Sequence, residues 1–447
     1  MRRTLRTWWL LPLVCAAPLA AQDTTRVPTG VRLGLIYQTQ YRPKLAVAPF
    51  TSQPEAANVA AQIHAIVQRD LDYSDRFEMT ELSGPITVGP EQYRHLNNLG
   101  VVFLLTGNVE PDASGGYQLR LELHDIVYQR VRQSGTYAIP SPSDRDFRLS
   151  VHAASDEVVF WATGQPGMAA SRVVFVRKGR GGYQLLVVDS DGEQLQEIAW
   201  LERPVASPVW SPDGKRIAYT ALSSDGQWDV LERDLATGNV RAVAQRRMLN
   251  LTPAYSPDGT RLAYAVSTGP SEDLYEVDLT DQRTRLLRRD AISPTYSPDG
   301  RQLAFNSSRL GQPHIYVMAI DGGEAALLSP FLYGEPGYYT SPDWSPTGSL
   351  VAFHGRSRGP HQIMVADASK PGSTVHQLTT EGWNEDPSWA PDGRHLVFSS
   401  VRDEGTGLYV MDTVTGRTRP LVLGGECLVP DWSPRLLSAS TLALQQR

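Results

Sequence analysis

The segment SPVWSPDGKRIAYT (residues 207–220) contains the pattern that dominates this chain. Nearly the same phrase returns as TPAYSPDGTRLAYA (252–265). Successive copies are 45, 41, 48, 45 and 43 residues apart, and this period is typical of repeat architectures such as solenoids and propellers. The motif serine, or the alanine that replaces it, recurs at Ser211, Ser256, Ser297, Ser345, Ala390 and Ser433.

Each copy begins with Pro-x-aromatic-Ser-Pro, and most copies continue with Asp-Gly. Proline presets φ for the second position of a type I turn, aspartate suits the third, and glycine accepts the left-handed conformation that closes a hairpin. Three more short strands follow, as in RLAYA (261–265), LYEVD (274–278) and TRLLR (284–288). Each unit is therefore predicted to be a four-stranded antiparallel meander, which is the blade of a β-propeller.

The end of the chain supplies a strand that the first unit lacks. Complete units begin at Pro208, Pro253, Pro294, Pro342 and Pro387. Another unit, which starts with RVVFV (172–176), has no Pro-x-aromatic opening, whereas the last copy, PDWSP (430–434), consists of the opening alone. Pairing the two leaves no open edge between blades. Residues 172–434 are predicted to form a six-bladed β-propeller closed by the C-terminal strand, with Trp432 packed in the first blade.

Residues 44–165 lack the repeat and are predicted to form a small mixed α/β domain, which makes the chain a two-domain α+β protein. KLAVAPF (44–50) indicates a buried strand, and further strands are expected at 101–110 and 117–127. Two sets of apolar residues have helical spacing: Val59, Ile63, Ile66, Val67 and Leu71, and then Phe147, Val151, Ala154, Val158 and Trp161.

The first residues are typical of a secretory signal peptide, assigned to 1–21 with cleavage near Ala21. Three arginines precede an apolar run that is too short to span a bilayer, and small residues follow it. Its removal takes the formal charge from −6 to −9, which argues against nucleic acid as a partner. No later segment is apolar enough for membrane insertion. Residues 22–43 form a tail with a strand-like centre, and 435–447 form a C-terminal tail.

The sequence predicts no catalytic residue, metal site or cofactor. Nine histidines are scattered without a His-Glu-x-x-His motif, and no Gly-x-Ser-x-Gly elbow is present. DSDGE (189–193) is interpreted as a hairpin turn and not as a calcium loop, because later ligands are missing. Cys427 is the sole cysteine of the mature chain, so no internal disulfide is expected. A secreted propeller that acts on or binds acidic glycans remains the alternative to an adaptor.

The chain resembles the TolB family. The resemblance rests on the blades and on five further stretches: RPKLAVAPF (42–50), DLDYSDRFEM (70–79), GGYQLRLELHDIV (115–127), HAASDEVVFWATGQPG (152–167) and WSPRL (432–436). It implies a non-enzymatic, monomeric adaptor of the Tol-Pal system in the periplasm. In that family the propeller binds the peptidoglycan-associated lipoprotein Pal, and the N-terminal segment engages the inner-membrane protein TolA. The system supports outer-membrane integrity and constriction at cell division.

Topology predicts which propeller face binds a Pal-like partner. The second-to-third connections and the blade-to-blade loops share one face, here called the mouth face, and they are longer than the tight turns on the opposite, tight-turn face. The longest loop, 329–340, carries the aromatic residues Phe331 and Tyr333, which are typical interface anchors. The predicted Pal-binding residues are Asn250, Thr252, Ser293, Tyr338, Tyr339, Asn384, Glu385 and Asp386. The predicted TolA-binding residues are Val31, Arg32 and Leu33.

Overall fold

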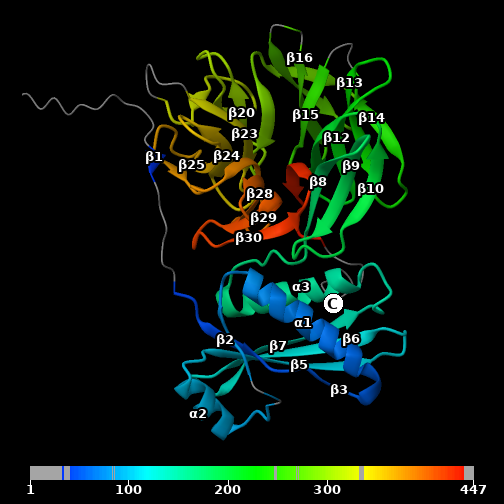
Figure 1. The fold of residues 1–447 in the computed structure, drawn as a ribbon, viewed down its shortest axis with the longest axis vertical. Coiled ribbons are helices and arrows are strands. Elements are labelled where there is room, and N and C mark those ends of the chain that lie inside the picture. The colour runs from blue at the N-terminus through cyan, green and yellow to red at the C-terminus, as the bar shows by residue number, and fades with distance from the viewer. Residues whose placement is uncertain are drawn as a thin grey trace, which may run out of the picture.

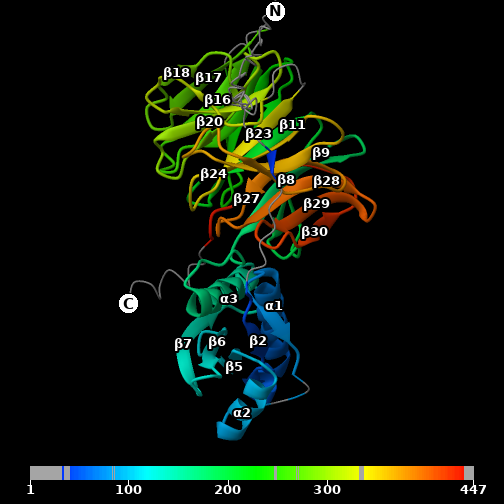
Figure 2. The same ribbon diagram turned by 90° about the vertical axis from the view of Figure 1, so that its left-hand side faces the viewer.

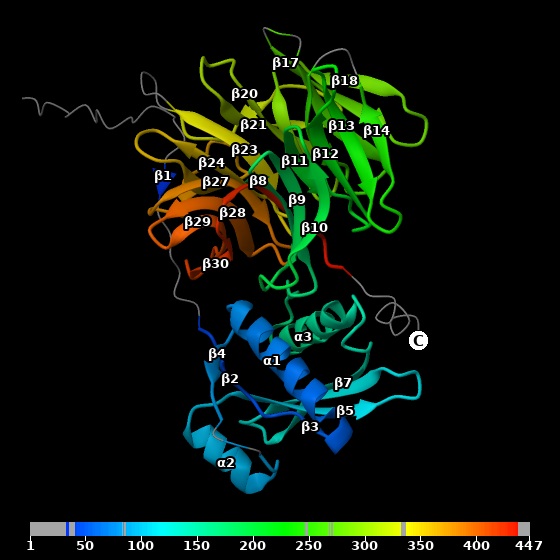
Figure 3. The same cartoon turned by 45° about the vertical axis from the view of Figure 1, so that its right-hand side comes forward.

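The computed structural model shows an α/β domain below a β-propeller (Figure 1). It describes residues 33–34, 41–82, 84, 86–245, 249–267, 269, 271–331 and 337–436. The predicted signal peptide and residues 437–447 lie outside the described residues. Turning the molecule by 90° or 45° shows the same separation of the two domains (Figures 2 and 3).

The N-terminal domain is built on a sheet in the order β4-β2-β5-β6-β7, with β3 paired to β5. Its strands are β2 (Lys44–Val47), β3 (Thr51–Ser52), β4 (Glu78–Thr80), β5 (Phe103–Pro111), β6 (Tyr117–Asp125) and β7 (Arg130–Ile139). β2 runs parallel to β4 and β5, whereas β5, β6 and β7 form an antiparallel meander. The three predicted strands are present as β2, β5 and β6, and β3, β4 and β7 are additional strands.

Helices cover both faces of this sheet. They are η1 (Pro54–Ala56), α1 (Ala57–Tyr73), α2 (Pro90–Asn98) and α3 (Phe147–Thr163). Successive side chains of a strand point to opposite faces, so Leu45 packs with α1 and α3, whereas Ala46 packs with α2. The two helices predicted from apolar spacing are confirmed as α1 and α3, and Ile63 and Val151 are fully buried between them and the sheet.

The propeller has six four-stranded blades, and each strand pairs antiparallel with its neighbour in the blade. Blade 1 contains β8 (Arg172–Gly179), β9 (Gly182–Asp189), β10 (Gln196–Leu201) and β31 (Glu426–Trp432). Blade 2 contains β11 (Val205–Trp210), β12 (Arg216–Leu222), β13 (Trp228–Asp234) and β14 (Val240–Ala244). Blade 3 contains β15 (Leu249–Tyr255), β16 (Arg261–Ser267), β17 (Glu272–Asp278) and β18 (Thr284–Arg288).

The remaining blades repeat the pattern. Blade 4 contains β19 (Ile292–Tyr296), β20 (Gln302–Ser307), β21 (His314–Ala319) and β22 (Ala326–Leu327). Blade 5 contains β23 (Tyr338–Trp344), β24 (Leu350–Arg356), β25 (Gln362–Asp367) and β26 (Val375–Gln377), and β1 (Leu33–Gly34) joins it at the edge. Blade 6 contains β27 (Trp383–Trp389), β28 (His395–Arg402), β29 (Gly405–Asp412) and β30 (Thr418–Leu423).

The C-terminal strand closes the ring, as the sequence predicted. β31 pairs antiparallel with β8, with Trp432 opposite Val173 and Glu426 opposite Lys178. The Trp432 indole is buried, and its Nε1 donates a hydrogen bond of 2.7 Å to Oγ of Ser171. The first strand of the first blade therefore comes from the last part of the described chain.

Side chains of the first strands tie neighbouring blades together. In each tie, the residue after the motif proline accepts a hydrogen bond from the backbone N–H of the motif aromatic residue in the next blade. The acceptor–donor pairs are Thr295–Trp344, Asp343–Trp389, Ser388–Trp432 and Asp431–Trp210, with distances of 3.1, 2.7, 3.0 and 2.7 Å. β31 is thus tied to the blade on each side of it.

Charged side chains join the tight-turn face of blades 1 and 6 to the N-terminal domain. Nε2 of His395 lies 3.2 Å from Oδ2 of Asp75, two residues after α1, and Arg394 donates to the backbone carbonyl of Asp75 at 3.0 Å. Arg148 of α3 donates to Asp189 of blade 1 at 3.1 Å. Although burial opposes protonation, Asp392 and Asp75 raise the pKa of His395 to about 9. The N-terminal domain therefore lies on the side of the propeller opposite to the mouth face.

Candidate functional site at the propeller mouth

The six first strands surround a central channel with a volume of about 330 Å³. The residue before the motif proline of each blade lines this channel. These residues are Ser207, Thr252, Ser293, Ser341, Asp386 and Val429. Three of the predicted Pal-binding residues, namely Thr252, Ser293 and Asp386, are therefore brought together around one opening.

The same six residues share an unusual backbone conformation, with φ between 45° and 55°. A residue before proline is normally extended, and a positive φ is uncommon for residues other than glycine. The conformation accompanies a register shift between first and second strands, for example between Leu251 and Ala254. Bulges of this kind redirect side chains and are frequent at functional rims.

All six first strands begin closer to the mouth than the sequence predicted. Their predicted starts were the motif prolines, but β15, β23, β27 and β31 begin four residues earlier, at Leu249, Tyr338, Trp383 and Glu426. Pairing with the second strand continues to these ends, because Tyr338 lies opposite Arg356 and Trp383 lies opposite Val401. Loop 329–340 is accordingly shorter than predicted, since Tyr338 and Tyr339 belong to β23.

This extension corrects three of the predicted contact residues. Strand alternation turns the second residue of each of these strands inward, so Asn250, Tyr339 and Asn384 are buried. Nδ2 of Asn250 donates to the carbonyl of Trp228 at 2.8 Å, and Oδ1 of Asn384 accepts a hydrogen bond from Ser400 at 2.7 Å. These three side chains hold the strands of the mouth in place and are not exposed to a partner.

The first residue of the same strands is exposed. Leu249, Tyr338 and Trp383 expose 39, 37 and 39% of their surface. Trp383 was not predicted from the sequence as a contact residue. Its position two residues before the acidic pair Glu385–Asp386 could have indicated that role. Phe331 is half-buried with its ring 5.6 Å from that of His314, and Tyr333 lies outside the described residues.

Tyr338 and Trp383 belong to a cluster of rings at the boundary of blades 5 and 6. The Tyr338 ring stacks on His361 with 5.5 Å between centroids and 5° between planes, and the Trp383 ring lies 4.8 Å from His361. Oε1 of Glu385 accepts hydrogen bonds from Nε1 of Trp383 at 2.7 Å and from Nδ1 of His361 at 2.5 Å. The Glu385 side chain therefore holds the aromatic rim in one arrangement.

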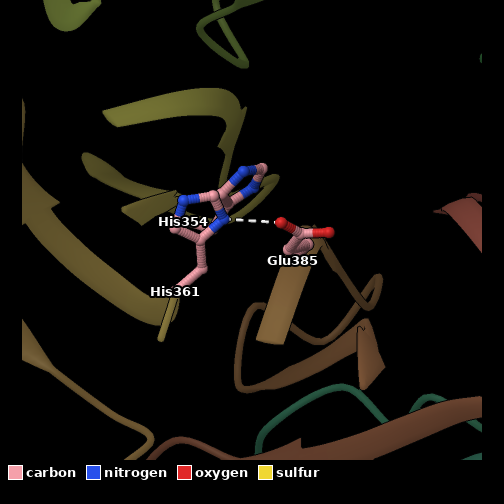
Figure 4. Close-up of side chains that lie close together, drawn as sticks. All are labelled: His354, His361 and Glu385. Carbon is pink, nitrogen blue, oxygen red and sulfur yellow. Dashed lines mark hydrogen bonds and ion pairs between the residues drawn. The ribbon is translucent and has the colours of Figure 1, made fainter. Parts of the chain in front are cut away.

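A second histidine lies beside this cluster (Figure 4). The His354 ring is 5.1 Å from that of His361, and its Nδ1 accepts a hydrogen bond of 3.0 Å from the backbone N–H of Asp386. Burial lowers the pKa of His354. Neither histidine was predicted from the sequence, because the two have no metal-binding spacing. The sequence feature that could have identified them is their position beside the second-to-third connection of blade 5. His354 lies near the end of β24 and His361 lies directly before β25.

Carboxylates make the mouth and the channel acidic. Asp386 lines the opening, and Asp343 and Asp431 line the channel below it. Burial raises the pKa of Asp343 to about 6, and burial together with Asp343 raises the pKa of Asp431. Although burial opposes ionisation, the hydrogen bonds from Trp383 and His361 lower the pKa of Glu385.

The predicted TolA-binding residues lie elsewhere. Val31 and Arg32 are outside the described residues, whereas Leu33 is in β1. β1 pairs in parallel with β26, with Leu33 opposite Val375 and Gly34 opposite His376. The strand-like centre predicted for the tail thus has a two-residue counterpart, which extends the outer edge of blade 5 and is separate from the mouth.

The described part of the chain contains no helix that is long and apolar enough to cross a membrane. Family profiles match most of the chain: one described as the TolB amino-terminal domain matches residues 35–131, and one described as the TolB beta propeller domain matches residues 161–436.

Relatives and solved structures agree with the profiles. The chain is 34% identical over 200 residues to the Tol-Pal system protein TolB of Alcanivorax borkumensis, which covers 43% of this chain and 45% of that protein. Such alignments span about half the length of several curated relatives. The alignment with the Tol-Pal system protein TolB of Bordetella pertussis is 29% identical over 438 residues and covers 96% of both chains.

Among solved structures, TolB from Acinetobacter baumannii is 25% identical, covers 88% of this chain and 97% of its own, and has a TM-score of 0.77. The propeller profile alone spans more than half of the residues. This chain belongs to the TolB family.

Proposed function

We propose that this protein is a non-enzymatic periplasmic adaptor of the Tol-Pal system. Its mouth face binds a Pal-like peptidoglycan-associated lipoprotein, and its N-terminal segment engages a TolA-like inner-membrane protein. In this role it supports outer-membrane integrity and constriction at division. The proposal rests on family membership and on the mouth, which lies opposite to the N-terminal domain and presents exposed aromatic side chains on paired strands.

The contact residues that we propose are those that the structure leaves accessible. They are Leu249, Thr252, Ser293, Tyr338, Trp383, Glu385 and Asp386. Asn250, Tyr339 and Asn384 enter the proposal as supports of the strands that carry these residues. Aromatic residues on such a rim are typical interface anchors, because they offer a large contact area with little loss of side-chain freedom.

The charge of the mouth argues against the alternative function. A propeller that binds acidic glycans needs basic groups where the ligand lies. Here Asp343 and Asp386 line the channel, and the mature chain has a formal charge of −9. Repulsion between like charges would weaken such binding.

Binding assays with the mature chain and the Pal domain of the same organism test the proposal. Tyr338→Ala and Glu385→Lys should each weaken binding about tenfold or more, at an unchanged melting temperature. Glu324→Lys is the matched charge reversal, because Glu324 is exposed in a third-to-fourth turn on the tight-turn face. Tyr128→Ala, at a residue that is 71% exposed in the N-terminal domain, is the matched aromatic control. Weaker binding by the controls together with unchanged binding by the mouth variants would place the interface elsewhere.

A further inference from the structure

Three potential metal ligands converge at the boundary of blades 5 and 6. His354 is in β24, His361 directly precedes β25, and Glu385 is in β27 of the next blade. One ligand atom from each residue lies within 4.8 Å of the others. Figure 4 shows the two imidazole rings side by side, with the Glu385 carboxylate beside them.

The other two groups of this kind in the described part of the chain are already neutralised. Asp70, His152 and Asp191 lie at the domain interface, where Arg69 and Arg148 pair with Asp191. The group of Asp75, His395 and Asp412 is likewise paired, since Arg394 binds Asp412 and Arg417 binds Asp75. In contrast, no described arginine or lysine forms an ion pair with Glu385.

His361 also keeps an unused nitrogen. Its Nδ1 donates to Glu385, and its Nε2 is buried without a hydrogen-bond partner in the described structure. Buried polar groups are nearly always paired. Because Nδ1 is the nitrogen that faces Glu385, it is the ligand atom of the site proposed below, and Nε2 does not take part in that site.

We propose that His354, His361 and Glu385 bind a Zn²⁺ ion at the propeller mouth. Two imidazole nitrogens and one carboxylate form a ligand set that zinc accepts, with a fourth position left for water or for a donor from another molecule. Calcium and magnesium prefer sites made of oxygen ligands, so this set disfavours them. Of the three proposed ligands, His354 and His361 are buried and Glu385 is half-buried.

Zinc binding would replace the hydrogen bond between Nδ1 of His361 and Glu385, and it would draw together three ligand atoms that lie within 4.8 Å of one another. Nδ1 of His361 and Oε1 of Glu385 lie 2.5 Å apart. Two ligands of one tetrahedral zinc ion, with bonds of about 2.0–2.2 Å, lie about 3.3 Å apart. A shift of less than about 1 Å in the Glu385 side chain, which is only half-buried, opens this space. The ion would join blade 5 to blade 6 at the mouth. Deeper in the channel, the Asp343 side chain already joins these two blades through the backbone N–H of Trp389.

Calorimetric titration of the tag-free, chelator-treated mature protein with ZnCl₂ tests the proposal. We expect one equivalent to bind in the micromolar range or tighter. His361→Gln and Glu385→Gln should each weaken this binding at least about tenfold, whereas His95→Gln, at an exposed histidine of α2, should leave it unchanged. Glu385→Gln keeps the shape of the side chain, so it separates loss of a ligand from loss of folding.

A second readout reports the ligand set directly. Co²⁺ bound to two imidazoles and a carboxylate in a four-coordinate site absorbs visible light, and we expect this absorption for the wild type and for His95→Gln. It should be lost in Glu385→Gln at an unchanged melting temperature. Absence of zinc binding by the wild type, or equal binding by wild type and Glu385→Gln, would overturn the proposal.

Discussion

Trp432→Ala tests whether the C-terminal strand holds the propeller closed. The Trp432 side chain is 5% exposed and packs in one cluster with Val173, Phe175 and Val410, so it joins blade 1 to blade 6. Truncation of a large aromatic side chain in a well-packed core costs about 3–5 kcal/mol. The substitution also removes the indole hydrogen bond to Ser171, whose hydroxyl keeps its bond to the carbonyl of Met168.

The expected loss is large enough to measure by thermal unfolding and by urea titration. For a domain of this size, about 3–5 kcal/mol corresponds to a melting temperature about 6–20 °C lower. Trp200→Ala is the matched control, because Trp200 is in β10 of the same blade and is 48% exposed. Its effect should stay near 1 kcal/mol or below. Equal melting temperatures for the two variants would refute the argument that Trp432 is part of the core at the closure.

Three further predictions follow from other parts of the molecule. Raising the pH from 7 to 10 should lower the free energy of unfolding. The stabilisation by protonated His395 is complete below about pH 6.5 and is lost as the pH rises through its folded pKa of about 9. In urea titrations, the stability of His395→Gln should therefore depend less on pH than that of the wild type. Asp431→Asn should leave stability at pH 7.5 unchanged or raised, because burial and Asp343 disfavour the Asp431 carboxylate, and any gain should vanish near pH 4. Deletion of residues 22–43 should abolish binding to a TolA-like domain at a nearly unchanged melting temperature, and retained binding would move that contact elsewhere.

The repeat made the propeller predictable. Each blade carries the same proline, aromatic residue and turn, so strand order and closure by β31 follow from counting. The same reasoning missed β7 and α2, which lack a clear apolar pattern. Most of β7 is exposed because it is an edge strand, and α2 buries only Tyr93 and Leu96 among its nine residues. Apolar periodicity identifies helices and strands that cover a core, but it does not identify elements that bury few side chains.

The mouth was predicted less well, for a physical reason. The motif proline was taken as the start of the first strand, but backbone pairing continues before it, as between Trp383 and Val401. Extending a strand by a few residues determines which side chains point inward. Asn250 and Asn384 have the polarity of surface residues, yet alternation places both in the interior, where Asn250 donates to the carbonyl of Trp228 and Asn384 accepts from Ser400.

The residues that line the channel differ in side chain but share one backbone conformation. Serine, threonine, aspartate and valine all hold the same left-handed φ before the motif proline. That conformation therefore does not depend on the side chain; it accompanies the register shift that all six first strands share. The exposed positions that begin β15, β23 and β27 hold Leu249, Tyr338 and Trp383, which differ as widely. The backbone is fixed independently of these side chains. Substitutions at the residue before a motif proline, or at the exposed first residue of a first strand, should therefore alter binding at the mouth more than they alter the stability of the propeller.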